Sequence, residues 1–262
     1  MCREPMATLG RVRGRGPQPV PEGHGELGGV AKRRFSKGAV LQVKRFGIML
    51  IAPSILAADF LHLEKDVEII NRHADIFHLD IMDGTFVPNI SFGFPVVEAI
   101  ATQAKKPMDV HLMIVHPEKY VERFAKAGAA MISFHYEAAL EASGEVLDLI
   151  HSFGIKAGIV INPDCPVEKI FPYLDKADYV LLMSVFAGFG GQSFIEDTYA
   201  RIRAVKAEIK RIGSPALIEV DGGVSPKNAG RLKKAGVDIL VAGSAVFRAE
   251  DPAAAVEALR KV

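Results

Sequence analysis

The chain has 262 residues, of which 49% are hydrophobic and 24% charged, a composition typical of a globular protein and too apolar for a disordered one. No apolar run reaches the roughly 18 residues that a membrane-spanning helix needs, so we do not expect this chain to be a membrane protein. The two cysteines, Cys2 and Cys165, are too few for a disulfide framework and fit a reducing, cytoplasmic setting.

Charge is divided unevenly along the chain, although its net value is only +1. Residues 1–48 carry ten Lys or Arg and three Asp or Glu, a net charge of +7, whereas residues 49–262 carry 22 basic and 28 acidic residues, a net charge of −6. The first segment is rich in Gly, Pro and Arg without a sustained apolar period, so we expect a disordered extension. The alternatives are a targeting arm, a nucleic-acid-binding arm, or sequence upstream of a start at Met49. Because residues 49–262 are acidic, we expect no nucleic-acid binding by this folded domain.

From Met49 onward, short β-branched and apolar runs alternate with amphipathic stretches of helical length. Eight runs predict strands, at 50–54, 76–82, 108–113, 130–136, 156–161, 179–185, 217–221 and 239–242. The stretches that predict helices are 59–73, 94–104, 117–127, 139–153, 166–173, 197–211, 226–235 and 252–261. Strands that alternate with helices indicate βαβ units and a parallel sheet.

Eight such units predict an α/β fold of the (β/α)8 TIM-barrel class, which needs roughly 200–250 residues. A doubly wound open sheet is the structural alternative. Its dinucleotide-binding form carries a Gly-x-Gly-x-x-Gly motif after the first strand. The segment that follows the strand at 50–54 has no glycine, which favours the barrel.

Polar side chains lie near the ends of three predicted strands, where a parallel barrel has its active face. His78 and Asp80 are two residues apart and therefore share one face of their strand, and His111 and Asp221 lie on two other strands. A carboxylate that faced the apolar helix layer would be costly, so we expect these side chains to point inward. Two imidazoles and two carboxylates in one pocket suit a divalent transition metal. A hydrogen-bonded polar cluster without a metal is the alternative.

Glycine-rich stretches follow the last three predicted strands. They comprise Gly188, Phe189, Gly190 and Gly191 after the sixth strand, Gly222 and Gly223 after the seventh, and Gly243 and Ser244 after the eighth. Glycines let backbone N–H groups approach an anion, and the loops after strands seven and eight are the usual phosphate site of this fold. Tight turns that need positive φ are the alternative explanation.

A phosphate site beside a metal with two carboxylates indicates a small phosphorylated substrate. Asp80 and Asp221 come from different sides of the barrel, so one carboxylate can remove a proton from one face of the substrate while the other returns a proton to the opposite face. A metal next to the carbonyl would stabilise the negative charge that develops between these steps. The pattern therefore predicts epimerisation next to a ketone.

Five segments closely resemble the ribulose-phosphate 3-epimerase family, and the resemblance extends over residues 49–262. The segments are IAPSILAADF at 51–60, HLDIMDG at 78–84, DVHLM at 109–113, GFGGQ at 188–192 and VDGG at 220–223. The resemblance implies a ribulose-phosphate-binding TIM barrel that forms a homo-oligomer. It also implies interconversion of D-ribulose 5-phosphate and D-xylulose 5-phosphate in the pentose phosphate pathway.

The resemblance also implies roles for individual residues. Asp80 resembles the proton acceptor and Asp221 the proton donor, and both, with His78 and His111, resemble the ligands of one divalent ion, whether zinc, iron, manganese or cobalt. Substrate contacts are implied for Ser54, His111, Gly188, Phe189, Gly190, Gly191, Gly222, Gly223, Gly243 and Ser244. Three thioethers, of Met82, Met113 and Met183, resemble residues that line the site, although core filling would also explain them.

One departure from the family pattern lies after the sixth predicted strand. The family usually has Asn-Pro-Gly where this chain has Phe186, Ala187 and Gly188. We expect weaker substrate binding or a looser loop there, with the chemistry retained. Two other functions stay open: an epimerase acting on allulose 6-phosphate, and a non-catalytic sugar-phosphate-binding barrel, which would be expected to lack one of the aspartates or histidines.

Overall fold

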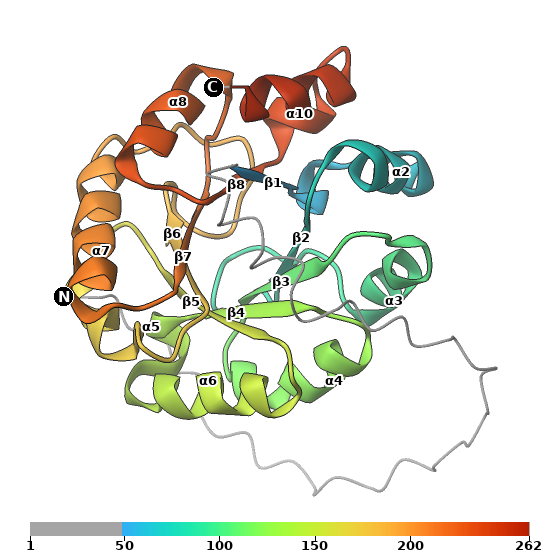
Figure 1. Ribbon diagram of the computed structural model, residues 1–262. Helices are drawn as coiled ribbons and strands as arrows, with labels where there is room; N and C mark the ends of the chain where they lie inside the picture. The colour runs from blue at the N-terminus through green and yellow to red at the C-terminus, as the bar shows by residue number, and fades with distance from the viewer. Residues whose placement is uncertain (1–48, 262) are drawn as a thin grey trace, which may run out of the picture.

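The computed structural model describes residues 49–261, which form a ring of parallel strands enclosed by helices (Figure 1). The extension expected over residues 1–48 lies outside the described residues. The eight strands are β1 (Leu50–Pro53), β2 (Phe77–Met82), β3 (Met108–Met113), β4 (Met131–His135), β5 (Lys156–Ile161), β6 (Tyr179–Met183), β7 (Leu217–Asp221) and β8 (Ile239–Ala242).

The strands pair in the order β1-β8-β7-β6-β5-β4-β3-β2, and each of these pairs is parallel. A single parallel bridge between Ser54 and His78 joins the β1 side to β2, so the ring is nearly closed. The predicted TIM barrel is therefore confirmed. Several strands are a residue or two shorter than predicted, because their apolar runs continue into the adjoining loops.

Helices connect successive strands on the outside of the ring (Figure 1). The α-helices are α2 (Leu63–His73), α3 (Phe94–Gln103), α4 (Val121–Lys126), α5 (Tyr136–Ala139), α6 (Ser143–Ser152), α7 (Thr198–Ile212), α8 (Pro226–Ala235), α9 (Ser244–Phe247) and α10 (Pro252–Arg260). Short 3₁₀ turns are η2 (Ile55–Ala57), η3 (Pro117–Lys119), η4 (Leu140–Ala142) and η5 (Val167–Tyr173).

The helix predicted at 59–73 begins only at Leu63, and three other predicted helices differ in form from those observed. The stretch at 166–173 forms the 3₁₀ segment η5, because Pro172 lacks the N–H that an α-helix would use there. The stretch at 117–127 is divided into η3 and α4. The stretch at 139–153 is divided into η4 and α6, and Leu140 at the start of η4 has a positive φ of 49° that a continuous helix does not allow.

Apolar side chains fill two layers. The larger layer lies between the strands and the helices, and a smaller one occupies the inside of the ring near the start of the strands. Tyr179 belongs to the inner layer and needs Gly158 beside it, since a Cβ at Gly158 would lie 2.3 Å from the Tyr179 ring. The inside of the barrel is therefore a packed core that supports the polar groups at the opposite end.

Among the described residues, every helix is too short or too polar to cross a lipid bilayer.

Candidate functional site

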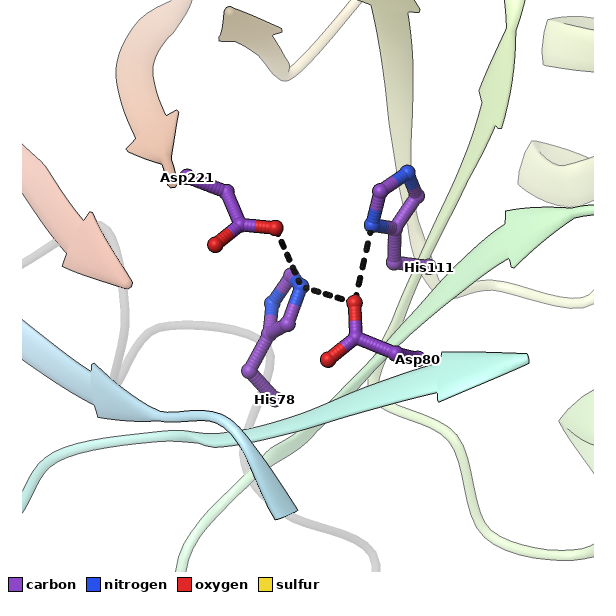
Figure 2. A group of neighbouring side chains, drawn as sticks. All are labelled: His78, Asp80, His111 and Asp221. Atoms are coloured by element: carbon purple, nitrogen blue, oxygen red, sulfur yellow. Dashed lines mark hydrogen bonds and ion pairs between the residues drawn. The ribbon is translucent and has the colours of Figure 1, made fainter. Parts of the chain in front are cut away.

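Four polar side chains meet at the carboxyl end of the barrel: His78 and Asp80 from β2, His111 from β3 and Asp221 from β7 (Figure 2). Asp80 pairs in register with His111, which places their side chains next to each other. Asp80 Oδ1 lies 3.3 Å from His78 Nε2 and 3.2 Å from His111 Nδ1. Asp221 Oδ2 lies 4.0 Å from His78 Nε2. The inward direction expected for these side chains is the one observed.

The site holds its charges away from water. Burial alone would raise the pKa of Asp80, but attraction to His78 and the hydrogen bond with His111 outweigh it and lower that pKa. Burial lowers the pKa of His111 to about 4, so this ring is neutral near pH 7. Burial and repulsion from Asp80 raise the pKa of Asp221 to about 7. The two carboxylates thus differ in how readily they hold a proton.

The four residues fit a divalent cation. One donor atom from each lies within 4.8 Å of the others, the spacing of ligands around one ion. His78 Nε2 is buried and has no hydrogen-bond partner among residues 49–261, which leaves a lone pair or an N–H facing the centre of the group. Within the same part of the chain, neither Asp80 nor Asp221 has a Lys or Arg within ion-pair distance. A cation would supply the missing partner for both carboxylates.

A second group of side chains, which the sequence analysis did not identify, lies beneath His78. Asp109 Oδ2 is 3.1 Å from His78 Nδ1, and the hydroxyl of Tyr179 donates to Asp109 Oδ1 at 2.5 Å. Glu219 Oε1 lies 3.6 Å from the same His78 nitrogen, and burial together with Asp109 raises the pKa of Glu219 to about 8. These groups orient His78 so that its Nε2 faces Asp80 and Asp221. Their signal in the sequence was the alternation of β3 and β7, which puts Asp109 and Glu219 on the same faces as His111 and Asp221.

A pocket opens above the four side chains. Its lining includes Asp80, Asp221 and the residues expected at the substrate, namely Ser54, Met82, Met113, Met183, Gly188, Phe189, Gly190, Gly191, Gly222, Gly223, Gly243 and Ser244. The Ser54 hydroxyl donates to Asp80 Oδ2 at 2.5 Å. His111, which was also expected to contact substrate, lies beneath this lining and is fully buried.

The glycine loops bend sharply around the same pocket. Gly188, Gly191, Gly222 and Gly223 all have positive φ, between 61° and 118°. Gly222 has a further constraint, because a Cβ there would lie 2.9 Å from the Val185 backbone nitrogen. Tight turns and close approach to an anion therefore both explain these glycines.

Arg248 is a lining residue that the sequence analysis missed. It follows the short helix α9, four residues after Ser244, and lines the same pocket as the glycine loops. Its guanidinium would complement a phosphate bound at these loops. A basic residue one turn after a Gly-Ser pair was the available sequence signal.

The loop between β6 and α7 covers one side of the pocket. Phe186 and Phe189 in this loop are about half exposed, at 51% and 54%. The Gln192 side-chain amide donates to the carbonyls of both residues, and the Asn89 amide donates to the carbonyl of Gly188. These bonds tie the loop to itself and to the loop that follows β2.

Comparison with known proteins identifies close relatives. The model of the Ribulose-phosphate 3 epimerase family matches residues 50–247. The ribulose-phosphate 3-epimerase of Synechocystis sp. is 47% identical over 214 residues, which cover 81% of this chain and 93% of that protein. The protein of the same name from Mycobacterium tuberculosis is 46% identical over 212 residues, which cover 81% of this chain and 92% of that protein.

Solved structures with lower sequence identity share the fold. KGPDC from Streptococcus mutans has a TM-score of 0.64 and 12% identity, with 82% of this chain and 96% of that chain covered. The tryptophan synthase α-subunit from Pyrococcus furiosus has a TM-score of 0.61 and 17% identity, with 82% of this chain and 98% of that chain covered.

Proposed function

The chain belongs to the ribulose-phosphate 3-epimerase family of isomerases, and from this we propose that it interconverts D-ribulose 5-phosphate and D-xylulose 5-phosphate by proton transfer at C3. The observation that carries the proposal is the pair of carboxylates, Asp80 on β2 and Asp221 on β7, which reach one pocket from different strands. Two such groups can exchange a proton with opposite faces of a bound substrate.

In the proposed reaction, Asp80 accepts the C3 proton of D-ribulose 5-phosphate, and Asp221 donates a proton to the opposite face of C3. The roles are exchanged in the reverse direction. Ser54, which donates a hydrogen bond to Asp80, holds this carboxylate in place. The thioethers of Met82 and Met183 line the same pocket as the two carboxylates, where they would limit access of water to the reacting carbon.

His78, Asp80, His111 and Asp221 would hold one divalent transition metal, of which zinc, iron, manganese and cobalt are the candidates. When bound, such an ion supplies positive charge that stabilises the negative charge developing on the substrate oxygens. The backbone of Gly188 to Gly191, Gly222, Gly223, Gly243 and Ser244, together with Arg248, would hold the phosphate group. This placement would set C3 near the two carboxylates.

The experiment that tests the proposal is proton exchange in D2O. The full chain is loaded with zinc or manganese and incubated with D-ribulose 5-phosphate, and NMR follows deuterium at C3 together with D-xylulose 5-phosphate. We expect deuterated product from the wild-type chain and none from Asp221→Asn. Allulose 6-phosphate is assayed in parallel, and faster turnover of this hexulose would replace the proposed substrate. No exchange with either sugar would leave a sugar-phosphate-binding barrel.

Assembly and location stay predictions from the family and from the composition. We propose a homo-oligomer that works in the cytoplasm. Sedimentation velocity tests the first, and fluorescence microscopy of the tagged full chain tests the second.

A further inference from the structure

A row of hydrogen-bonding groups leads away from the proposed metal site, from β3 through the ends of β4 and β5 to the β6–α7 loop. His111 Nε2 lies 2.9 Å from His135 Nε2, and His135 Nδ1 lies 3.3 Å from the Asn162 amide nitrogen. The Asn162 amide oxygen accepts a hydrogen bond from the Ala187 backbone N–H at 3.2 Å. The reaction proposed above does not use His135, which is fully buried and contacts the rings of His111 and Phe86.

Two neutral imidazoles in this contact have two proton arrangements that satisfy both rings, because each ring has one donor and one acceptor nitrogen. In the first, His111 donates from Nδ1 to Asp80 Oδ1 at 3.2 Å and accepts at Nε2 from His135. His135 Nδ1 then accepts from the Asn162 amide. Every donor in the row has an acceptor, so this arrangement suits the site without an ion.

A cation held by His111 Nδ1 requires the second arrangement, since a ligating nitrogen carries no proton. The remaining proton of His111 then lies on Nε2 and is donated to His135 Nε2, so His135 carries its proton on Nδ1. One proton leaves His111 Nδ1, one shifts between the two Nε2 atoms, and one is taken up at His135 Nδ1. Both rings are neutral before and after.

Glu137 is placed to accept from His135 in this second arrangement. Its Oε2 lies 3.5 Å from His135 Nδ1, and it is buried without a hydrogen-bond donor among the described residues. Its other oxygen accepts from the Asn162 backbone N–H at 2.8 Å, which keeps the carboxylate against this row. A buried acceptor without a donor is costly, so a proton on His135 Nδ1 satisfies an atom that the first arrangement leaves unpaired.

The second arrangement also changes what Asn162 can do. Its amide nitrogen now faces an N–H of His135, and the side chain relieves this contact by turning its oxygen toward the ring. That turn takes the oxygen away from the Ala187 N–H and removes a bond that holds the β6–α7 loop. The identity of residue 187 matters, because a proline there would have no N–H to donate.

We propose that His135 is a positioning residue that sets the proton position on His111 and, through Asn162, removes one bond that restrains the β6–α7 loop when the metal site is filled. The inference rests on the metal site of the proposed function. It links the ion to the loop that carries Gly188 to Gly191, because this loop loses its bond to Asn162 when the ion is in place while its bond to Asn89 stays.

The test is long-range proton–nitrogen NMR of the histidine rings in the wild-type full chain, before and after addition of zinc. We expect His135 to change from the Nε2–H to the Nδ1–H form and His111 from the Nδ1–H to the Nε2–H form. His78 is the internal control, because its Nδ1 faces Asp109 in both states and only its Nε2 signal should respond. A His135 ring that keeps one form throughout would overturn the inference. If the ring signals of His78 and His111 both stay unchanged on addition of zinc, the metal site and the inference with it are overturned.

Two variants separate the effect of His135 on the metal site from its effect on the β6–α7 loop. His135→Phe keeps a ring against Phe86 but removes both nitrogens, and we expect zinc affinity in a chelator competition to fall by about 10- to 100-fold. In the wild-type chain, zinc should speed hydrogen exchange of the Ala187 amide, and in His135→Phe this response should disappear. Ala187→Pro is the matched loop variant, in which His135 should still change its form with zinc. Unchanged zinc affinity in His135→Phe would overturn the proposal. An Ala187 amide whose exchange rate does not respond to zinc in the wild type would overturn it as well.

Discussion

Aspartates occur at both ends of the barrel, and the two groups have opposite surroundings. At the base, Asp75, Asp178 and Asp238 directly precede or lie just before β2, β6 and β8. At the mouth, Asp80 lies in the second half of β2, and Asp221 is the last residue of β7. The base aspartates face cations and backbone N–H groups, whereas the mouth aspartates face histidines and each other.

The base aspartates share one pattern of bonds. Each donates its backbone N–H to the carbonyl of a residue on the neighbouring strand and accepts the N–H of that same residue with its carboxylate. The strand residues are Ile51, Ala157 and Ile218, and the carboxylate bonds measure 2.9, 3.0 and 2.9 Å. A cation completes each site, from Arg260 at 3.0 Å, Lys156 at 2.5 Å and Lys206 at 3.4 Å.

The partners of a buried carboxylate decide what it does. At the base, burial alone would raise the pKa of Asp178, but bonds from Lys156 and Ala157 outweigh it and lower that pKa. At the mouth, burial and repulsion from Asp80 raise the pKa of Asp221 to about 7. A carboxylate with all its partners inside the protein stabilises the fold, whereas one that lacks them is available to an ion or a substrate.

The largest expected effect comes from removing a carboxylate at the mouth. Asp80→Asn should lower kcat by about 10²- to 10⁴-fold, because it removes the base that accepts the C3 proton. Steady-state kinetics with D-ribulose 5-phosphate and a circular-dichroism melt measure activity and folding together. Retention of more than about a tenth of the wild-type kcat would show that Asp80 is not the base.

Removing the metal tests the mouth as a whole. Exhaustive chelation should lower kcat by at least about 10²-fold, since a bound cation contributes several kcal/mol of charge stabilisation. Zinc, manganese or cobalt added back one at a time should restore activity and show which ion works best. Full activity in a chain shown by elemental analysis to be free of metal would contradict the proposed site.

Removing the charge of an aspartate at the base should lower stability and leave activity unchanged, the reverse of the effect at the mouth. Asp178→Asn should lower the free energy of unfolding by about 1–3 kcal/mol at pH 7, because a charge-assisted group of bonds is lost, while kcat stays at the wild-type value. Because the pKa of Asp178 is lowered on folding, its contribution is present above the unfolded value of 3.8 and is lost as the pH falls through the folded value.

Urea unfolding of both chains at several pH values measures this contribution. The free energies of unfolding of the wild-type chain and of Asp178→Asn, plotted against pH, should converge as the solution becomes strongly acidic. A gap that is constant with pH would mean that Asp178 acts without its charge.

The smallest effect is expected in the loop over the pocket. Phe186→Asn combined with Ala187→Pro restores the family pattern and should lower KM by less than about tenfold, which is under about 1.4 kcal/mol. kcat should change little, since neither residue belongs to the carboxylate pair that transfers the proton. Steady-state kinetics over a range of substrate concentrations separate the two constants, and unchanged values of both would contradict a role for this departure.

Much of the molecule was predictable from local patterns. β-Branched runs that alternate with amphipathic stretches identified all eight strands and the barrel class, because strand and helix periods differ. The same alternation placed His78 and Asp80 on one face, and the rule that parallel strands end at one mouth brought His111 and Asp221 to them. Family motifs then indicated the chemistry.

The tertiary structure decided which atoms meet. The placing of Asp109 and Glu219 under His78 depends on the order and register of β2, β3 and β7 around the ring. The contact of His135 with His111 and the bond from Ala187 to Asn162 likewise join segments that are far apart in the sequence. A sequence period states which face a side chain occupies, whereas a hydrogen bond depends on ångström-scale distances between strands, and these arise only when the ring is closed and packed.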